Sequence, residues 1–321
     1  MRGNFKIFWE SLLLNQDPPH SSVEEPISHY SEEHFGEEFW EYFQNSIESP
    51  PRIIECFERA SSHFISEAER KRLLTFVVVG GGPTSIEFTS ELSDFIKEDV
   101  IKYYADLRLN YEIVVVEAAK HLLGTFDAKL SSYVEKQMFK RRVTVLSGEA
   151  VKEVRKVSVV LGSGREIPFG VCVWSTGNTA LDFVKQLGLE MNREGRICVE
   201  DNLRICGQED GVFAIGDCAA HKEAPLPQLA QVANQQGRHL AVILNKGDPE
   251  RPFKFRSKGS MAQLGLFQAV ADVGGAKLTG FTAFLTWRSA YWTLTVSLAN
   301  KILIPMYWFK SFWFGRDISR F

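Results

Sequence analysis

The chain has 321 residues, a formal net charge of −3, 45% hydrophobic and 24% charged residues. These values are near globular averages and exclude a disordered or collagen-like chain. The net charge argues against a general nucleic-acid binder, so we expect no nucleic-acid partner. Five cysteines without a C-x-x-C pair exclude a disulfide framework, a zinc knuckle and a thioredoxin-type dithiol, and we expect no metal site.

The charge is unevenly distributed along the chain. Residues 20–60 carry ten acidic and two basic residues, a net of −8, whereas residues 251–321 carry ten basic and two acidic residues, a net of +8. Twelve of the last 41 residues are aromatic, including four of the seven tryptophans. A basic, aromatic C-terminal region on a near-neutral protein predicts contact with an anionic membrane surface.

The N-terminal part is predicted to be helical and acidic. Residues 1–14 lack the features of a signal peptide, and the acidic residues that follow disfavour a mitochondrial transit peptide. We expect helices at 35–47 and 53–71, and we assign residues 1–71 to an acidic helical segment.

From residue 73 the pattern becomes that of alternating strands and helices. The apolar, β-branched run Leu73–Val79 predicts a buried parallel strand, and the next helix has apolar residues spaced on one face. Further elements are predicted as a strand at 113–116, a helix at 127–141, a strand at 143–146, antiparallel strands within 150–167, strands at 170–174 and 212–215, and a helix at 227–244. The order indicates a parallel βαβαβ unit.

A glycine-rich turn joins the first strand to its helix. In Gly80-x-Gly82 the first glycine permits a tight turn, and the second lets the backbone approach a pyrophosphate at the helix N-terminus. Pro83 suits the first helical turn, and Ser85 stands where the fingerprint has glycine or alanine. The context favours a dinucleotide site, and the alternative is a glycine turn of any α/β protein.

Glu117 ends the second strand of the unit. An acid at this position accepts hydrogen bonds from the adenosine ribose and repels a 2′-phosphate, which favours NADH over NADPH. It lies 32 residues beyond Ser85, further than the usual spacing of about 20. The alternative is an acid that caps a strand at the surface.

Several segments together resemble one family. They are VVVGGGPTSIEF (77–88), VWSTGN (173–178), FAIGDCA (213–219), LPQLAQVANQQG (226–237) and FGRDISRF (314–321). They resemble type II NADH dehydrogenases, the single-subunit NADH:quinone oxidoreductases of mitochondria, plastids and bacteria. The first two glycine-containing motifs are shared by the whole two-dinucleotide flavoprotein superfamily, whereas AQVANQQG and the aromatic C-terminal region are far more specific.

The resemblance covers roughly residues 50–321 and implies a domain organisation. The expected fold is a Rossmann-like FAD/NAD(P)-binding α/β fold with parallel sheets and an amphipathic, membrane-associating helical C-terminal region. We expect an NADH-binding domain at 72–178, the remaining part of an FAD domain at 179–255, and a membrane-anchoring region at 256–321.

The resemblance also implies roles for individual residues. It implies that Glu87 is catalytic and lies near the nicotinamide and quinone, and that Gln235 and Gln236 are catalytic and lie near the flavin ring and quinone headgroup. The residues that it implies bind the cofactors are Gly80, Gly81, Gly82, Pro83, Thr84, Glu117, Thr176, Gly177, Gly216 and Asp217. Asp217 would meet the ribityl chain of FAD, although a turn residue or helix cap is the alternative. Uncharged amides can hydrogen-bond a quinone without adding charge, and the alternative for them is an ordinary polar helix face.

The implied activity passes electrons from NADH through FAD to a ubiquinone-like quinone, without proton pumping, at the mitochondrial inner membrane. A plastid or bacterial membrane and a homodimer are compatible with the family. Residues 1–70 contain only two glycines, Gly3 and Gly36, and therefore no second dinucleotide fingerprint. An inactive, truncated NADH-binding or membrane-associated remnant is thus an alternative, and a ferredoxin- or apoptosis-factor-like reductase is a third.

The C-terminal region is not predicted to span a membrane. Lys301 and Pro305 interrupt its best apolar window, and a spanning helix needs about 20 predominantly apolar residues. We expect residues 281–314 to lie in the bilayer interface or, alternatively, to pack into the core or a dimer contact. The residues expected at the interface are Trp287, Tyr291, Trp292, Leu294, Leu298, Ile302, Trp308 and Trp313.

Overall fold

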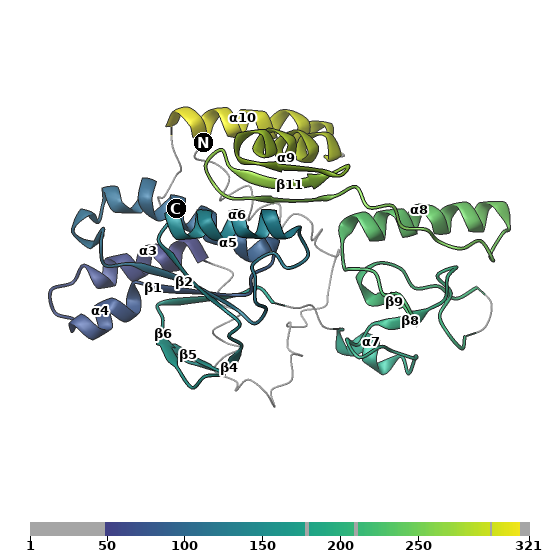
Figure 1. The fold of residues 1–321 in the computed structure, drawn as a ribbon, viewed down its shortest axis with the longest axis horizontal. Coiled ribbons are helices and arrows are strands. Elements are labelled where there is room, and N and C mark those ends of the chain that lie inside the picture. The colour runs from purple at the N-terminus through teal and green to yellow at the C-terminus, as the bar shows by residue number, and fades with distance from the viewer. Residues whose placement is uncertain (1–48, 177–179, 209–210, 296, 315–321) are drawn as a thin grey trace. The chain divides into compact units, whose positions relative to one another are not determined.

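A computed structural model describes residues 49–176, 180–208, 211–295 and 297–314 (Figure 1). The described chain divides into two compact units, one formed by 49–176 with 259–314 and the other by 180–258. The helix predicted at 35–47 and the candidate cofactor residue Gly177 lie outside the described residues.

The first unit opens with two helices, α3 (Ser49–Ala60) and α4 (Glu67–Leu73), where the sequence predicted one continuous helix. That prediction was wrong because serines end one helix and start the next. The Ser61 hydroxyl donates to the Glu58 carbonyl (2.6 Å) just after α3, and Ser66 caps α4 by accepting the Glu69 N–H (3.2 Å).

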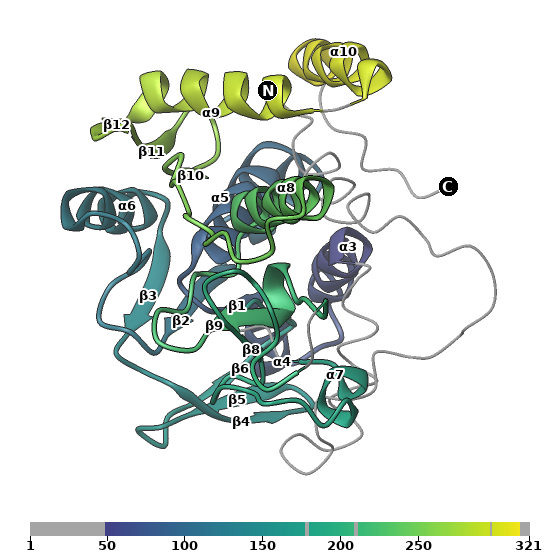
Figure 2. The same ribbon diagram turned by 90° about the vertical axis from the view of Figure 1, so that its right-hand side faces the viewer.

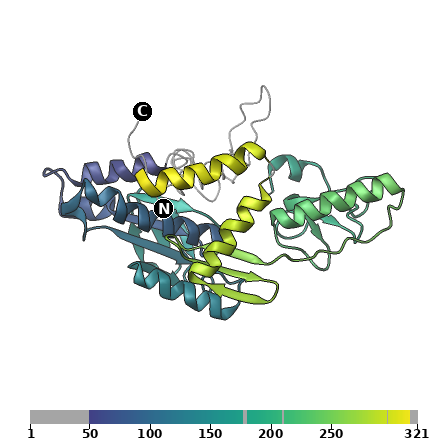
Figure 3. The same cartoon turned by 90° about the horizontal axis from the view of Figure 1, so that it is seen from above.

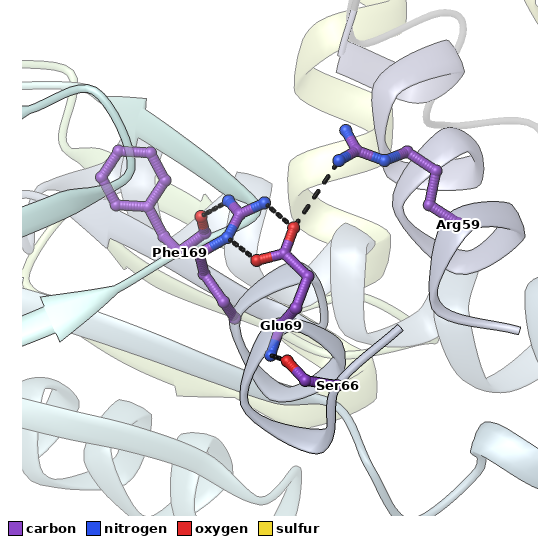
Figure 4. Close-up of polar contacts among 5 residues, drawn as sticks. Arg59, Ser66, Glu69 and Phe169 are labelled. Carbon is purple, nitrogen blue, oxygen red and sulfur yellow. Dashed lines mark hydrogen bonds and ion pairs between the residues drawn. The ribbon is translucent and has the colours of Figure 1, made fainter. Parts of the chain in front are cut away.

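An arginine of α4 fastens this helix to a distant segment (Figure 4). The Arg72 guanidinium donates to both carboxylate oxygens of Glu69 (2.7 and 2.6 Å) and to the Phe169 carbonyl (2.7 Å). Arg59 lies 3.6 Å from the same carboxylate. The hydrogen bond from Arg72 lowers the pKa of Glu69 below its usual range. One side chain therefore joins segments 97 residues apart.

We expect Arg72→Met to destabilise the first unit by about 2 kcal/mol, because the variant loses charge-assisted hydrogen bonds and leaves the Phe169 carbonyl without this donor. Urea unfolding followed by circular dichroism measures the change. Arg59→Met is the matched control, since this arginine is more exposed and makes a longer ion pair. Equal unfolding midpoints for the two variants would contradict the prediction.

The centre of the first unit is a parallel sheet of four strands in the order β3-β2-β1-β7. Alternate residues of β1 face opposite sides: Phe76 and Val78 join the core with α3, α5 and α6, while Val77 and Val79 pack against β5 and β6 (Figure 1). The predicted βαβαβ unit and the α/β fold class are confirmed. Its elements are β1 (Thr75–Val79), α5 (Pro83–Glu98), β2 (Glu112–Glu117), α6 (Ala128–Lys140), β3 (Val143–Ser147) and β7 (Val171–Trp174).

A three-stranded antiparallel sheet covers the second face of the parallel sheet. It consists of β4 (Val151–Arg155), β5 (Ser158–Leu161) and β6 (Glu166–Pro168), in that order. The prediction of antiparallel strands within residues 150–167 is confirmed.

The C-terminal part of the first unit begins with a sheet that the sequence analysis did not predict. Strands β10 (Ser260–Gln263), β11 (Ala269–Val273) and β12 (Ala276–Thr279) are antiparallel, and α9 (Gly280–Leu294) packs on β11 (Figure 2). Helix α10 (Leu298–Phe314) follows α9 at an angle (Figure 3). Within the described ranges, no helix combines the length and apolar character needed to cross a bilayer.

Polar and aromatic contacts join the last two helices. The Arg288 guanidinium of α9 lies 3.7 Å from the centre of the Trp308 ring of α10, and the Trp292 indole N–H donates to the Lys301 carbonyl (2.9 Å). Side chains predicted at a membrane interface are exposed on both helices, among them Tyr291, Trp292, Leu298, Ile302 and Trp313. The side chain of Leu294 lies outside the described set.

The second unit contains α7 (Asp182–Gln186), a parallel pair β8 (Ile197–Val199) and β9 (Ala219–His221), and α8 (Ala230–Lys246). The predicted strand at 212–215 was wrong. Val212 is exposed, and Phe213 makes only an isolated bridge with Arg204. The parallel pairing instead uses residues on the far side of Gly216, which has φ +78° and turns the chain.

Candidate functional site

Gly80 forms the turn between β1 and α5, in a conformation that favours glycine. Its φ is +117°, and its N–H donates to the Val116 carbonyl (2.8 Å). A Cβ atom here would lie 2.9 Å from Ser85 Oγ and 3.0 Å from Thr176 Cγ2. The structure therefore places Thr176, a predicted cofactor residue, directly beside the glycine turn of residues 80–82.

Ser85, the departure from the usual fingerprint, has a partner in the neighbouring strand connection. Its Oγ lies 2.6 Å from Ser175 Oγ, and the Ser175 hydroxyl donates to the Val79 carbonyl (3.3 Å). Ser85 is fully buried, and this contact gives its hydroxyl group a hydrogen-bond partner inside the core. The sequence showed an unusual serine but not its partner, which is 90 residues away.

The predicted ribose acid lies against the glycine turn. Glu117 accepts hydrogen bonds from the N–H of Gly81 and from the N–H of Ala119 (2.6 Å for the latter). A Cβ on Gly81 would approach Glu117 Oε2 to 2.7 Å, which explains a glycine here too. The structure thus brings Glu117 and the glycine turn together at the carboxyl edge of the sheet, where such folds bind ligands.

The first residues of α5 complete this edge. Gly82 is the N-cap, Pro83 is the first helical residue, and Thr84 follows; Pro83 and Thr84 are exposed. No atom of the chain lies within 4 Å of a Cβ built on Gly82. The helix start therefore presents its backbone N–H groups and its positive dipole end, which suits a phosphate group.

Glu87, one turn into α5, is buried rather than presented at the surface. Its Oε1 accepts the backbone N–H of Gln263 (2.9 Å), a residue of β10. Burial raises the pKa of Glu87 to about 7; the nearby Glu91 adds to the rise, and the Gln263 hydrogen bond opposes it. A buried carboxyl with a pKa near neutrality can hold or release a proton at physiological pH.

In the second unit, Gly216 and Asp217 form a short 3₁₀ turn beside α8. The Gly216 N–H donates to Gln236 Oε1 (2.7 Å), and Gln236 is buried. The Asp217 carbonyl accepts a hydrogen bond from Gln228 Nε2 (3.0 Å), while the Asp217 side chain is exposed. Three of the predicted residues therefore lie together, with Gln236 holding the turn that presents the carboxylate.

Gln235 and its neighbour one turn earlier, Gln231, contact the main chain. The Gln235 amide accepts the Arg256 N–H (3.1 Å) and donates to the Arg256 carbonyl (3.0 Å), and Gln231 Oε1 accepts the Lys258 N–H (3.0 Å). Through these hydrogen bonds, the two amides of α8 hold the main chain of residues 256–258 against the helix. A role for Gln235 at a quinone stays a prediction.

The comparisons with known proteins decide the family. Residues 54–237 match the family described as pyridine nucleotide-disulphide oxidoreductase, and residues 257–317 match the NDH2 C-terminal domain. The chain belongs to the type II NADH dehydrogenase family. The second match covers the region that contains β10 through α10, and it disfavours the ferredoxin- or apoptosis-factor-like alternative.

Relatives with similar sequences carry concordant names. The chain is 41% identical over 292 residues to a probable NADH dehydrogenase of Dictyostelium discoideum, covering 88% of this chain and 64% of that protein. It is 40% identical to the mitochondrial internal alternative NAD(P)H-ubiquinone oxidoreductase A1 of Solanum tuberosum and 35% identical to the mitochondrial external NADH-ubiquinone oxidoreductase 2 of Saccharomyces cerevisiae. The matches cover 80% and 84% of this chain, and 56% of each relative.

Solved structures confirm the fold. NDH2 of Plasmodium falciparum, in complex with NADH, superposes with a TM-score of 0.78 at 22% identity, covering 84% of this chain and 72% of that one. The chain spans a little over half to just under two thirds of the length of the relatives named above.

Proposed function

We propose that this chain oxidises NADH and passes the electrons through FAD to a ubiquinone-like quinone, as a peripheral protein of the mitochondrial inner membrane and without pumping protons. One observation carries the proposal: helix α5 begins at the glycine turn and, one turn later, bonds the region that matches the NDH2 C-terminal domain through Glu87 and Gln263. Helix α5 therefore links the proposed nucleotide-binding edge to the region that matches the NDH2 C-terminal domain.

Each group of residues has a role in this proposal. The glycine turn and the first turn of α5 bind the NADH pyrophosphate, and Glu117 binds the adenosine ribose. The exposed Asp217 carboxylate, on a turn fixed by Gln236, suits the hydroxyl groups of the FAD ribityl chain. FAD, when bound, supplies a hydride acceptor that can reduce a quinone. Glu87 holds a proton for quinone reduction, and the amides of Gln235 and Gln236 lie on the helix that follows the Asp217 turn.

The test is quinone-dependent NADH oxidation by the purified full chain incubated with FAD and liposomes. We expect absorbance at the flavin bands and loss of NADH only when a soluble ubiquinone analogue is present. Glu87→Gln should lower turnover while leaving NADH binding unchanged, because it removes the proton but not the nucleotide contacts. Flavin-containing protein that oxidises NADH with no dependence on quinone would contradict the proposal.

A second candidate is an NADH-binding protein without turnover. It is favoured by residues 1–70, whose two glycines, Gly3 and Gly36, provide no second dinucleotide fingerprint. This candidate predicts NADH binding by the full chain without bound flavin, even after incubation with excess FAD. Absorbance of the desalted protein separates the two candidates.

We expect Glu117→Gln to relax the preference for NADH. The amide keeps the size of the carboxylate but no longer repels a 2′-phosphate, so the ratio of NADPH to NADH dissociation constants should fall about tenfold. Titration of protein fluorescence with each nucleotide measures the ratio. Glu112→Gln, at the start of the same strand, is the matched control. Equal affinity of the unmutated chain for both nucleotides would refute the role of Glu117.

Membrane association is proposed for α9 and α10. Between Val273 and Phe314 the sequence has four basic residues, Lys277, Arg288, Lys301 and Lys310, and no acidic one. Large apolar side chains are exposed on α10, including Ile302, Leu303, Met306 and Phe309. Exposed apolar groups interspersed with cations suit the interface of an anionic bilayer. The alternative partner of this face is a second copy of the chain, in a homodimer contact.

We expect the double variant Ile302→Glu, Met306→Glu to lose most binding to phosphatidylglycerol-containing liposomes in a flotation assay. Both side chains are more than half exposed, so the charges repel the membrane without disturbing the core. Phe139→Glu, at an even more exposed apolar position on α6, is the matched control. If the double variant floats with the liposomes as the unmutated chain does, this face is not the anchor.

A further inference from the structure

Arg288 of α9 contacts aromatic rings from both of the last two helices. Its guanidinium carbon lies 3.7 Å from the centre of the Trp308 ring of α10 and 5.3 Å from the centre of the Phe284 ring of α9. Both distances are within the range of cation–π attraction. Phe284 is buried against the sheet of β10, β11 and β12. The cation is therefore held against a packed part of the first unit.

The spacing of residues along the two helices explains this contact. Phe284, Arg288 and Trp292 are four residues apart, so they share one face of α9. Lys301 and Trp308 are seven residues apart and share one face of α10. The Trp292 indole N–H donates to the Lys301 carbonyl (2.9 Å). The two faces thus meet at two points, with Arg288 at one and Lys301 at the other.

No acidic side chain offsets the charge of Arg288 in this part of the chain. The sequence from Val273 to Phe314 contains no aspartate or glutamate. Burial alone lowers the pKa of Arg288 to about 10, so the side chain stays charged at neutral pH. Aromatic faces attract a cation but offer no oxygen acceptor to the five guanidinium N–H donors. A partly buried cation of this kind favours an anionic ligand.

A phosphate group has the chemistry that this cation requires. The guanidinium fork donates two parallel hydrogen bonds to two phosphate oxygens. Because aromatic rings already position the side chain, binding costs less conformational entropy. The exposed side chains nearby are Tyr291 and Trp292 on α9 and Ile302 on α10. Exposed aromatic groups of this kind favour the level of the lipid headgroups, where phosphate is abundant.

We propose that Arg288 binds the phosphate of an anionic phospholipid headgroup at the junction of α9 and α10, with Lys301 as a second cation. The inference deepens the proposed function and rests on its membrane association, because it names the lipid group that the C-terminal region recognises. Lys310, which is exposed on α10, contributes only general attraction to the membrane surface. Phosphatidylglycerol suits the site better than phosphatidylcholine, whose quaternary ammonium competes with Arg288 for the phosphate.

The first test is co-sedimentation of the full chain with vesicles of phosphatidylcholine and phosphatidylglycerol. Arg288→Lys keeps the charge but loses the planar fork, so we expect about tenfold weaker binding. The deficit should persist at about 1 M salt, because a partly buried pair is screened less than an exposed one. Lys310→Arg, the reverse exchange at an exposed position, is the matched control and should leave the affinity unchanged. Circular dichroism establishes that both variants are folded.

The second test detects the contact itself and needs no vesicles. Nitrogen-15 NMR follows the arginine side-chain N–H signals of the full chain during titration with dihexanoyl phosphatidylglycerol below its critical micelle concentration. The Arg288 signal is assigned by its loss in Arg288→Lys and again in Arg288→Gln. We expect a saturable shift of this signal, and a much smaller one with dihexanoyl phosphatidylcholine. Inorganic phosphate tests the other source of the same group and should saturate the site only at far higher concentration.

An Arg288 signal that does not shift with the short-chain lipid overturns the inference, as does equal vesicle affinity of Arg288→Lys and the unmutated chain at high salt. Saturation by inorganic phosphate at the same concentration as by the lipid would overturn the assignment to a lipid. A chain that binds vesicles but shows no shift of the Arg288 signal overturns only this inference. A shift in a chain that does not bind vesicles overturns only the proposed membrane association.

Discussion

Gly80→Ala is expected to weaken NADH binding at least tenfold. An alanine at φ +117° has a strained backbone, and such conformations cost about 1–3 kcal/mol. Its Cβ would also lie 3.0 Å from the Ser175 carbonyl oxygen, a backbone atom that cannot rotate away. The turn must therefore open, which moves the N–H groups at the start of α5 away from the phosphates that we propose they bind.

The change in affinity is measured by isothermal titration of the full chain with NADH. Gly164→Ala is the matched control, because Gly164 also has a positive φ, +85°, but no atom lies within 4 Å of its Cβ position. Both variants carry backbone strain, and only Gly80→Ala displaces neighbouring atoms, which lie at the glycine turn. NADH affinity unchanged in Gly80→Ala would show that the turn does not bind the cofactor.

The parallel sheet was predictable from local sequence because both of its faces are covered. Buried parallel strands consist of apolar, β-branched residues, and Leu73–Val79 and 113–116 show this composition directly. The same criterion failed at 212–215, where an apolar run includes the exposed Val212 and pairs only through an isolated bridge. Apolar composition alone does not provide a neighbouring strand.

The C-terminal sheet escaped prediction because its strands are short and rich in alanine, which has weak β-propensity. One signal was present: Gly274-Gly275 lies between β11 and β12, and a two-glycine turn is typical of a hairpin.

The candidate site was predictable where its motifs are contiguous in the sequence, as in the glycine turn. Its long-range partners were not, since Gln263 and Glu87 are 176 residues apart and no local pattern joins them.

Arg141→Met is expected to destabilise the first unit by about 3–5 kcal/mol, the largest effect on stability predicted here. The substitution leaves the carboxylate of Asp94, which is 4% exposed as a side chain, without its cation, and a buried unpaired charge is costly. It also removes a donor from the Leu264 carbonyl, in the turn after β10. We expect the β10–β11 hairpin to loosen from α5 and the Gln263 contacts to weaken with it.

Thermal unfolding and hydrogen exchange of the β10–β11 amides measure the two effects. Arg142→Met, the exposed neighbouring position, should change neither. The double variant Asp94→Leu, Arg141→Met removes both charges, so it should recover part of the lost stability, because a buried ion pair replaced by apolar groups is often neutral. If Arg141→Met unfolds at the same temperature as the unmutated chain, the ion pair is not what holds the β10–β11 hairpin against α5, the helix that follows the glycine turn.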